Sequence, residues 1–395
     1  MIYLFVLFLL LCLSFRYDIN GKTQYRDQWY FIMLVVFILI AGLRWRLMVD
    51  TPNYIYYFYH IYPPLEDFSF EDYPIGKDPF YVLINSIVKS LGGRFYWVQL
   101  IEATVVNVLV FKYIKRHSSY LFTCLFFYAI SCYLGYSMET MRASFSIVIC
   151  LYANDYILEK KWLKGYLLLL LALMFHAQTL VMFILPLLFF LRFNKIGVIV
   201  LLGAFVLGYF LQALLGDYIE LLELSDEIGD KADKYIESDR YGVQNGNINY
   251  FMLKIFPSLA YSVISLIYVK RTSPQNKLLK LEPFVMLGMF FVIMRMNMEI
   301  AYRFVSYFSI HNILFGSFLF VNVAKNISKY KRGVAYMRAV LLFIPYFLIV
   351  GYTKYLRAYT FLPYSSVLER KIDREREYKY SQTKKWTPPA NINEY

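Results

Sequence analysis

The sequence contains little charge for its length. Only 17% of its 395 residues are Asp, Glu, Lys or Arg, whereas 59% are hydrophobic. A soluble protein of this size needs more charged residues to cover its surface. Runs of roughly 17–25 apolar residues, which are long enough to cross a bilayer, recur along the chain. We therefore expect an all-α polytopic membrane protein, because backbone groups in lipid must be satisfied within each segment.

Cysteine is scarce, and the signatures of several enzyme classes are missing. The four cysteines lie inside apolar runs, without CxxC or metal-ligand spacing, and are expected to behave as small hydrophobic residues. The chain has no Walker A motif, no GxGxxG after a strand, no HExxH, no GxSxG and no DxD-like pair. We therefore expect no metal and no cofactor. ATP, nicotinamide and nucleotide-sugar donors are disfavoured, and a lipid-linked donor fits better.

Acidic residues are outnumbered, and the net charge is +13. Such an excess can indicate a nucleic-acid partner, but here the lysines and arginines cluster in short loops between apolar runs. That distribution is typical of the cytoplasmic loops of membrane proteins. We therefore expect membrane lipid around the chain and no nucleic acid.

The apolar stretches predict about twelve membrane helices. Their expected ranges are 1–15, 29–43, 95–111, 119–136, 143–158, 163–175, 178–192, 196–215, 247–269, 283–298, 301–324 and 337–353. The segment DPFYVLINSIVKSLGG (78–93) is short, so we interpret it as a re-entrant or interfacial helix. We expect one polytopic domain over 1–353, with long outer loops at 44–94 and 216–246, and a polar tail over 354–395.

The basic loops also predict the orientation. An N-terminus outside the cytoplasm places the base-rich loops inside, as the distribution of Lys and Arg requires. These loops contain Arg16, Lys22, Arg26, Lys112, Lys115, Arg116, Lys160, Lys161, Lys164, Lys270, Arg271, Lys277, Lys280, Lys325, Lys329, Lys331 and Arg332. The two long acidic loops and the tail then lie on the outer face.

A few arginines remain on the outer face, at or near helix ends: Arg44, Arg46, Arg142 and Arg303. Each could simply extend its side chain to the membrane interface. Ionisable residues at membrane depth are costly, however, and indicate a functional site. Several guanidinium groups on one face suit a phosphate or diphosphate. Arg142 also precedes an apolar helix, whose N-terminus favours an anion.

His176 lies at the outer break between two apolar runs, in LLALMFHAQTLVMF. A histidine in this position is either a structural residue or a proton acceptor that works near neutral pH. The two readings are about equally supported by the sequence.

The acids on this face are Asp50, Asp78, Glu139 and Glu299. Glu139 stands three residues before Arg142, and Glu299 stands four before Arg303, so salt bridges within one helix are the simpler explanation. Asp50 could cap a turn. One of these carboxylates could instead deprotonate a sugar hydroxyl.

Tyrosine is abundant, with 39 residues against 5 tryptophans. Most tyrosines are expected at the membrane interfaces and between helices. The first outer loop has a denser cluster of them: Tyr54, Tyr56, Tyr57, Tyr59 and Tyr62. A flat ring with a hydroxyl suits a sugar, so this cluster is a candidate glycan contact.

The segment GLRWRLMVDTPNY (42–54) resembles the first motif of the EpsG family, relatives of the Wzy polysaccharide polymerases. It matches at Gly42, Leu43, Arg44, Trp45, Asp50 and Tyr54, and it has Met48 where the family usually has glycine. Further resemblances follow in order along the chain. They are DPFYVLINSIVKSLGG, METMRASFSIVICLYA with Ala143 in place of the usual glutamine, FHAQTL with His176, the set Arg303, Tyr307 and Phe308, and LPYSS with Pro363 and Tyr364.

This resemblance implies a GT-C-like membrane glycosyltransferase that needs no metal. It would transfer a growing glycan from a polyprenyl-diphosphate carrier to an incoming lipid-linked repeat unit, outside the bacterial cytoplasmic membrane. A chain-length regulator is a possible partner. The expected catalytic residues are His176, Glu139 and Asp50. The expected contacts of the diphosphate and the glycan are Arg44, Arg46, Arg142, Arg303, Tyr54, Tyr307 and Asp78.

Two other functions stay open. A flippase for lipid-linked oligosaccharides would need charges along a path through the bilayer, for which Glu102, Lys254 and Arg295 are the candidates. A ligase would use the same donor with a different acceptor, and the sequence hardly separates it from a polymerase.

Overall fold

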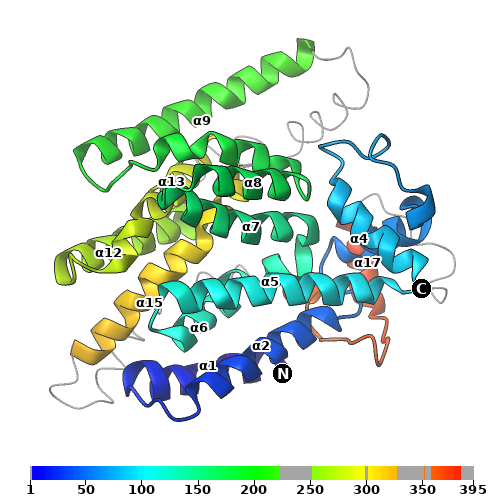
Figure 1. Ribbon diagram of the computed structural model, residues 1–395, viewed down its shortest axis with the longest axis horizontal. Helices are drawn as coiled ribbons and strands as arrows, with labels where there is room; N and C mark the ends of the chain where they lie inside the picture. Colours follow the sequence, from blue (N-terminus) through cyan, green and yellow to red (C-terminus); the bar gives the residue numbers. More distant parts are fainter. Residues whose placement is uncertain (1, 222–250, 299–300, 327–350, 352–356, 384–395) are drawn as a thin grey trace. The chain divides into compact units, whose positions relative to one another are not determined.

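Helices make up the architecture of the computed structural model (Figure 1), which describes residues 2–221, 251–298, 301–326, 351 and 357–383. Within these residues there is no strand, although Arg44 and Ser366 form an isolated antiparallel β-bridge. The chain divides into two compact units, each described by itself. Unit 1 is Met1–Phe183 with Val350–Tyr395, and unit 2 is Ile184–Ile349. That residues 1–353 form one domain stays a prediction.

The long helices of unit 1 form a bundle. They are α1 (Ile2–Leu13), α2 (Arg26–Gly42), α5 (Phe95–His117), α6 (Leu121–Ser131), α7 (Met141–Leu158) and α8 (Trp162–Leu173). Helix α2 packs against α5, α5 against α7, α7 against α8, and α1 against α6. The close approach of α2 to α5 depends on Gly42, because a Cβ there would lie 2.6 Å from the Leu100 side chain.

Base-rich loops gather at one end of this bundle. Lys115 Nζ lies 2.7 Å from Asp27, and Arg116 lies 2.9 Å from Glu159. His117 Nε2 lies 2.8 Å from Asp155. Three of the loops that the sequence assigns to the cytoplasm therefore lie together, at the end opposite the segment 43–94.

Segment 43–94 forms short helices at the other end of the bundle. They are α3 (Thr51–Tyr56), a π-helical turn (Tyr57–Ile61), a 3-10 turn (Leu65–Asp67) and α4 (Pro79–Ser90). The 12 residues of α4 extend about 18 Å, which is shorter than the roughly 30 Å of a bilayer core. Lys89 Nζ, in its last turn, donates a hydrogen bond to the carbonyl of Tyr62 at 2.7 Å. Helix α4 thus packs on the loop and on α5, and its short length is that expected of an interfacial or re-entrant helix.

The C-terminal tail packs on the segment that follows α2. The Trp45 and Met48 amides donate to the carbonyls of Ser365 and Thr360, each at 2.8 Å. Glu377, in α17 (Arg374–Thr383), accepts two hydrogen bonds of 2.8 Å from the Arg46 guanidinium. Residues 357–383 therefore pack on the segment 43–48 (Figure 1), which predicts that both lie on one side of the membrane.

Unit 2 contains α9 (Lys195–Leu221), α12 (Phe256–Thr272), α13 (Glu282–Met294), α14 (Tyr302–Val305) and α15 (Ser309–Asn326). A π-helical turn (Phe251–Ile255) precedes α12, and 3-10 turns occur at Leu185–Leu188, Lys277–Leu281 and Ser306–Phe308. Helix α13 packs on α9, α12 and α15. At the start of α13, the buried Glu282 carboxylate lies 2.5 Å from Lys270 Nζ.

Five of the described helical segments are long and apolar enough to cross a membrane. They are Ile2–Ile19, Phe95–His117, Lys195–Gln212, Phe251–Thr272 and Tyr302–Lys325. Leu121–Ser131 and Trp162–Leu173 are apolar but shorter. The expectation of an all-helical membrane protein is confirmed, whereas twelve crossings stay a prediction. The helix expected at 337–353 and most of the loop expected at 216–246 lie outside the described residues.

The regular helix expected over 178–192 is wrong. The chain forms two 3-10 segments there, Ala177–Phe183 and Leu185–Leu188. Pro186 has no N–H to continue an α-helical ladder. The Thr179 hydroxyl bonds to the Ala172 carbonyl at 3.4 Å, and such local side-chain bonds compete with regular helix.

Cysteine labelling tests which segments share a side. We expect Leu91→Cys after α4 and Leu368→Cys in the tail, both highly exposed, to react with a membrane-impermeant maleimide from the same side of the membrane. Lys161→Cys, at the opposite end of the bundle, should require a permeabilised membrane. If Leu368→Cys behaved like Lys161→Cys, the packing of the tail on the first outer loop would be wrong.

Candidate functional site

One carboxylate in unit 1 contacts two of the residues that the sequence marks as functional. Asp78 Oδ2 accepts a hydrogen bond of 2.6 Å from Arg142 Nη1, and Asp78 Oδ1 lies 3.4 Å from His176 Nδ1. The exposed fraction of the side chain is 5% for Asp78, 35% for Arg142 and 18% for His176. The acid therefore lies beneath, while the guanidinium and the imidazole reach solvent.

The three residues come from the ends of three helices. Asp78 immediately precedes α4 and adopts a left-handed backbone with φ +54°, followed by Pro79 in the first turn. Arg142 is the second residue of α7, and His176 follows α8. Since proline favours the first turn of a helix, the DP sequence fixes where α4 begins and thus where the carboxylate lies.

Aromatic packing holds the helix ends in place. The Phe80 amide donates to the Met174 carbonyl at 3.1 Å. The Phe175 ring meets Phe80 edge-on at 5.7 Å and stacks on Phe145 of α7 at 4.8 Å. Ser146 of α7 hydrogen-bonds to Thr179. These contacts tie α4, α7 and the turn after α8 together, so Asp78, Arg142 and His176 have a rigid support.

Tyr54 of α3 completes the site. The Arg142 guanidinium lies over the Tyr54 ring, 5.6 Å from its centroid, which suits a cation–π contact. Burial raises the pKa of Tyr54 to about 12, although Arg142 opposes this shift. Burial also raises the pKa of Tyr62 and Tyr81, whose rings adjoin Tyr54 in the same apolar cluster. These hydroxyls stay protonated near neutral pH.

The arrangement can bind an anion and accept a proton. With Nδ1–H directed at Asp78, the imidazole would present Nε2 as the basic nitrogen. A carboxylate that orients a histidine in this way also stabilises the imidazolium that forms when it takes a proton. Arg142 keeps a partly exposed side chain at the start of α7, where the helix dipole favours negative charge.

Two predicted arginines lie elsewhere in unit 1. Arg44 is fully buried, and its Nη1 donates to the carbonyls of Ala41 at 2.6 Å and Ser137 at 3.3 Å. Arg46 is bound by Glu377, with side-chain exposures of 4% and 10%. Neither is among the contacts of Asp78.

The predicted acids Glu139 and Asp50 have contacts other than Arg142 and His176. Glu139 pairs with Arg357 of the tail, so the salt bridge expected between Glu139 and Arg142 is wrong. The π-helical turn Gly135–Glu139 and the break at Thr140 interrupt the helical spacing that this pair would need. Asp50 stands just before α3, and its carbonyl accepts the Tyr54 amide at 3.1 Å.

Arg303 and Tyr307 belong to unit 2, where Arg303 lies in α14 and Tyr307 is buried. Their part in a site with Arg142 stays a prediction, and Glu299 lies outside the described residues. Of the residues considered for a path through the bilayer, Glu102 is buried in α5. Arg295 lies over the Tyr302 ring at the end of α13, and the side chain of Lys254 is not described.

Sequence reasoning missed the partners that the tail supplies. Arg357 reaches Glu139 across 218 residues of sequence, and Glu377 reaches Arg46 across 331. Only the LPYSS element indicated that this end of the chain has a role. No periodic pattern connects positions so far apart.

The model of the family described as EpsG matches residues 28–366, a span that includes Asp78, Arg142 and His176. Comparisons with curated proteins and with solved structures give no match.

Removing the Asp78 carboxylate should destabilise the protein. In Asp78→Asn, the negative charge and one of the two acceptor oxygens shared by Arg142 and His176 are lost. We expect the free energy of unfolding to fall by about 1–3 kcal/mol, a range that allows for the partial exposure of Arg142. The measurement is the apparent melting temperature in detergent. Glu71→Gln, an exposed acid of the same loop, is the control. Equal melting temperatures for the two variants would show that the shared carboxylate contributes nothing to stability.

Proposed function

Because the chain belongs to the EpsG family, we propose that it is a membrane glycosyltransferase that polymerises polyprenyl-diphosphate-linked oligosaccharide repeat units into a surface polysaccharide. The observation that carries this proposal is the Asp78 carboxylate shared by Arg142 and His176. It joins a group suited to a diphosphate and a group suited to proton transfer.

Arg142 is proposed to bind the diphosphate of the donor. Its guanidinium can form two parallel hydrogen bonds to phosphate oxygens, and it stays charged at any relevant pH. When the bond between the sugar C1 and the diphosphate oxygen breaks, the oxygen keeps the electron pair. Arg142 and the N-terminus of α7 stabilise that developing negative charge.

His176 is proposed as the general base. Its Nε2 removes the proton from the acceptor hydroxyl while the oxygen forms the new glycosidic bond to C1. Asp78 positions the ring through Nδ1 and stabilises the resulting imidazolium. His176 suits this role better than Glu139, which Arg357 neutralises. Asp50 remains the other candidate base.

The other predicted residues receive different parts in this proposal. Tyr54, beside Arg142, offers a ring to a sugar. Arg44 and Arg46 support the segment that leads into α3, since one is buried and the other is paired. Arg303 and Tyr307 are proposed as further substrate contacts from unit 2. A chain-length regulator remains a proposed partner.

The proposed site faces the outside of the bacterial cytoplasmic membrane. The basic loops of unit 1 gather at the end of the bundle opposite Asp78, and basic loops favour the cytoplasm. Glycan segments already carried across the membrane would therefore meet the site from the outer side.

The length distribution of the surface polysaccharide tests this function. In a strain that lacks the gene, wild type should restore a ladder of lengths, whereas Arg142→Ala should leave single repeat units. Loss of one such charge-stabilising group lowers a rate by about 10²–10³-fold. His176→Gln should also shorten the ladder, because a general base contributes about 10²–10⁴-fold. Amounts of protein in the membrane are matched by immunoblot.

Lys77→Gln is the matched control, since Lys77 is basic, exposed and adjacent to Asp78 in sequence. It should restore the full ladder. A full ladder from Arg142→Ala would contradict the proposal. Lipid-linked units trapped on the cytoplasmic side in the deletion strain would identify a flippase instead. A normal ladder that stays on its lipid carrier would identify a ligase.

A further inference from the structure

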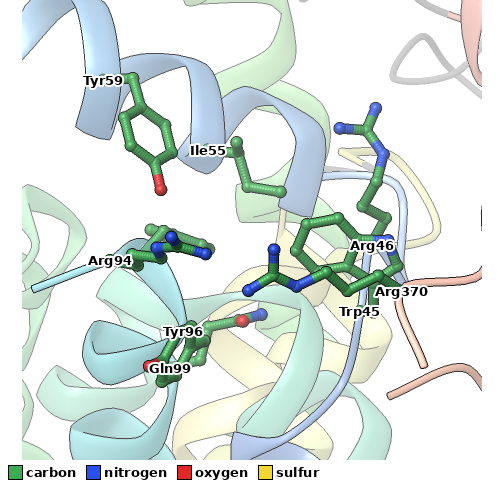
Figure 2. A pocket seen from close by; sticks show the side chains of 9 residues that line it. Trp45, Arg46, Ile55, Tyr59, Arg94, Tyr96, Gln99 and Arg370 are labelled. Carbon is green, nitrogen blue, oxygen red and sulfur yellow. The ribbon is translucent and has the colours of Figure 1, made fainter. Parts of the chain in front are cut away.

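A second pocket lies in unit 1, apart from the contacts of Asp78. Figure 2 shows this pocket, which opens to solvent and encloses about 20 Å³, enough for a group about the size of a water molecule. Its lining comes from the segment after α2, from α3 and the turn after it, from the first turns of α5 and from the tail. The lining residues are Trp45, Arg46, Ile55, Tyr59, Arg94, Phe95, Tyr96, Gln99 and Arg370.

Two of its three arginines have no acidic partner among the described residues. Arg46 is neutralised by Glu377, but no carboxylate in that part of the chain pairs with Arg94 or Arg370. Figure 2 shows the guanidinium groups of Arg94 and Arg370 extending into the pocket from opposite sides, while that of Arg46 points away. The Arg370 guanidinium lies 5.8 Å from the centroid of the Trp45 ring. The pocket therefore has an uncompensated positive charge.

Hydrogen-bond donors in the pocket also lack partners. Gln99 is only 2% exposed, and its Nε2 has no hydrogen-bond partner in the described part of the chain. The indole nitrogen of Trp45 is in the same situation. Buried donors without acceptors are costly, so native proteins rarely keep them without a reason. Figure 2 shows the Gln99 amide directed toward Arg370, into the space between the arginines.

Aromatic rings form much of the wall. Trp45, Tyr59 and Tyr96 offer flat apolar faces. Burial raises the pKa of Tyr59, although Arg94 and Arg370 oppose the shift, so its hydroxyl remains a neutral donor. The pocket also includes the start of α5, whose dipole favours an anion. Rings, neutral donors and positive charge together suit a sugar ring that carries an anionic group.

We propose that this pocket binds an anionic sugar residue of the glycan, one that carries a carboxylate or a phosphate. Arg94 and Arg370, both exposed, hold the anionic group from two sides at the mouth of the pocket, and one of its oxygens enters the enclosed space and accepts a hydrogen bond from Gln99 Nε2. The sugar ring stays outside the enclosed space and packs on the partly exposed rings of Trp45, Tyr59 and Tyr96. The inference rests on the proposed function, because it assumes that the substrate is a glycan. It predicts that acidic repeat units are preferred over neutral ones.

Helix α3 lies between this pocket and the candidate functional site. Tyr54 contacts Arg142, whereas the next residue, Ile55, lines the pocket. A helix is about 10–12 Å across with its side chains. A glycan whose reacting sugar lies at Arg142 can therefore place another sugar, a few residues further along its chain, at the pocket. An anionic lipid headgroup fits less well, because α3 and the tail, which do not cross the membrane, form part of the wall.

Binding of defined probes to the purified full-length protein tests the inference. The protein is placed in phosphatidylcholine nanodiscs and titrated with trigalacturonate, glucose 6-phosphate and neutral maltotriose in a calorimeter. We expect wild type to bind at least one anionic probe more tightly than maltotriose. The double variant Arg94→Gln/Arg370→Gln should lower that affinity about 10-fold or more, since hydrogen bonds to charged groups are the strong ones. Both arginines are exposed, so folding is not at risk.

Lys379→Gln is the matched control, because it removes one positive charge from the tail outside the pocket. It should leave the affinity unchanged. Failure of wild type to bind either anionic probe, or equal affinities for wild type and the double variant, would overturn the proposal. A third outcome would also overturn it: phosphatidylglycerol in the nanodisc stabilises wild type but not the double variant, and wild type binds no anionic sugar. That last result would assign the pocket to a lipid headgroup.

These measurements need no turnover, so they separate the pocket from the reaction. If Arg142→Ala abolishes the ladder while the double variant binds the probes like wild type, the polymerase proposal is supported and the sugar-binding proposal is contradicted. If the double variant loses binding while Arg142→Ala makes a full ladder, sugar binding in the pocket is supported and the proposed reaction is contradicted.

Discussion

The end of unit 1 that carries the segment 43–94 depends on the shared carboxylate of Asp78. A buried charge is stable only when it is paired and hydrogen-bonded. Arg142 and His176 meet this requirement from two other parts of the chain, so three helix ends must lie together. The same contacts fix the orientation of the Arg142 and His176 side chains, which remain partly exposed to solvent. Stability and the chemistry proposed for this site thus come from one arrangement.

The segment that leads from α2 into α3 also carries buried charges, and their hydrogen-bond partners come from other parts of the chain. Arg44 is fully buried, and its guanidinium donates to the carbonyls of Ala41 and Ser137. Arg46 is paired with Glu377. Arg46 and Met48 have φ angles of +49° and +72°, in the left-handed region where glycine is favoured. Met48 adopts this left-handed backbone at the position where the resemblance to the family implies glycine, so a larger side chain is accommodated here.

The tail closes this end of the unit. Backbone hydrogen bonds join it to residues 43–48, and side-chain pairs join it to Arg46 and Glu139. Arg370 from the tail also enters the second pocket. The two groups of arginines therefore differ in surroundings. Arg142 lies over a buried acid, whereas Arg94 and Arg370 form no salt bridge in the described part of unit 1. The first suits a diphosphate that must be released, and the second suits a charged sugar that is held.

The sequence by itself determined the membrane class and most of the helices, and it marked three of the residues that meet in the candidate site. Apolar runs mark helices in a bilayer because backbone groups must be satisfied there within each segment. Arg142, Asp78 and His176 stand out because they lie at the ends of apolar runs away from the base-rich loops. Only the tertiary structure decided which charges meet. Arg142 pairs with Asp78 and not with the nearby Glu139, since a π-helical turn interrupts the helix between them. The partners of Glu139 and Arg46 come from the far end of the chain, and helical periodicity carries no information across such separations.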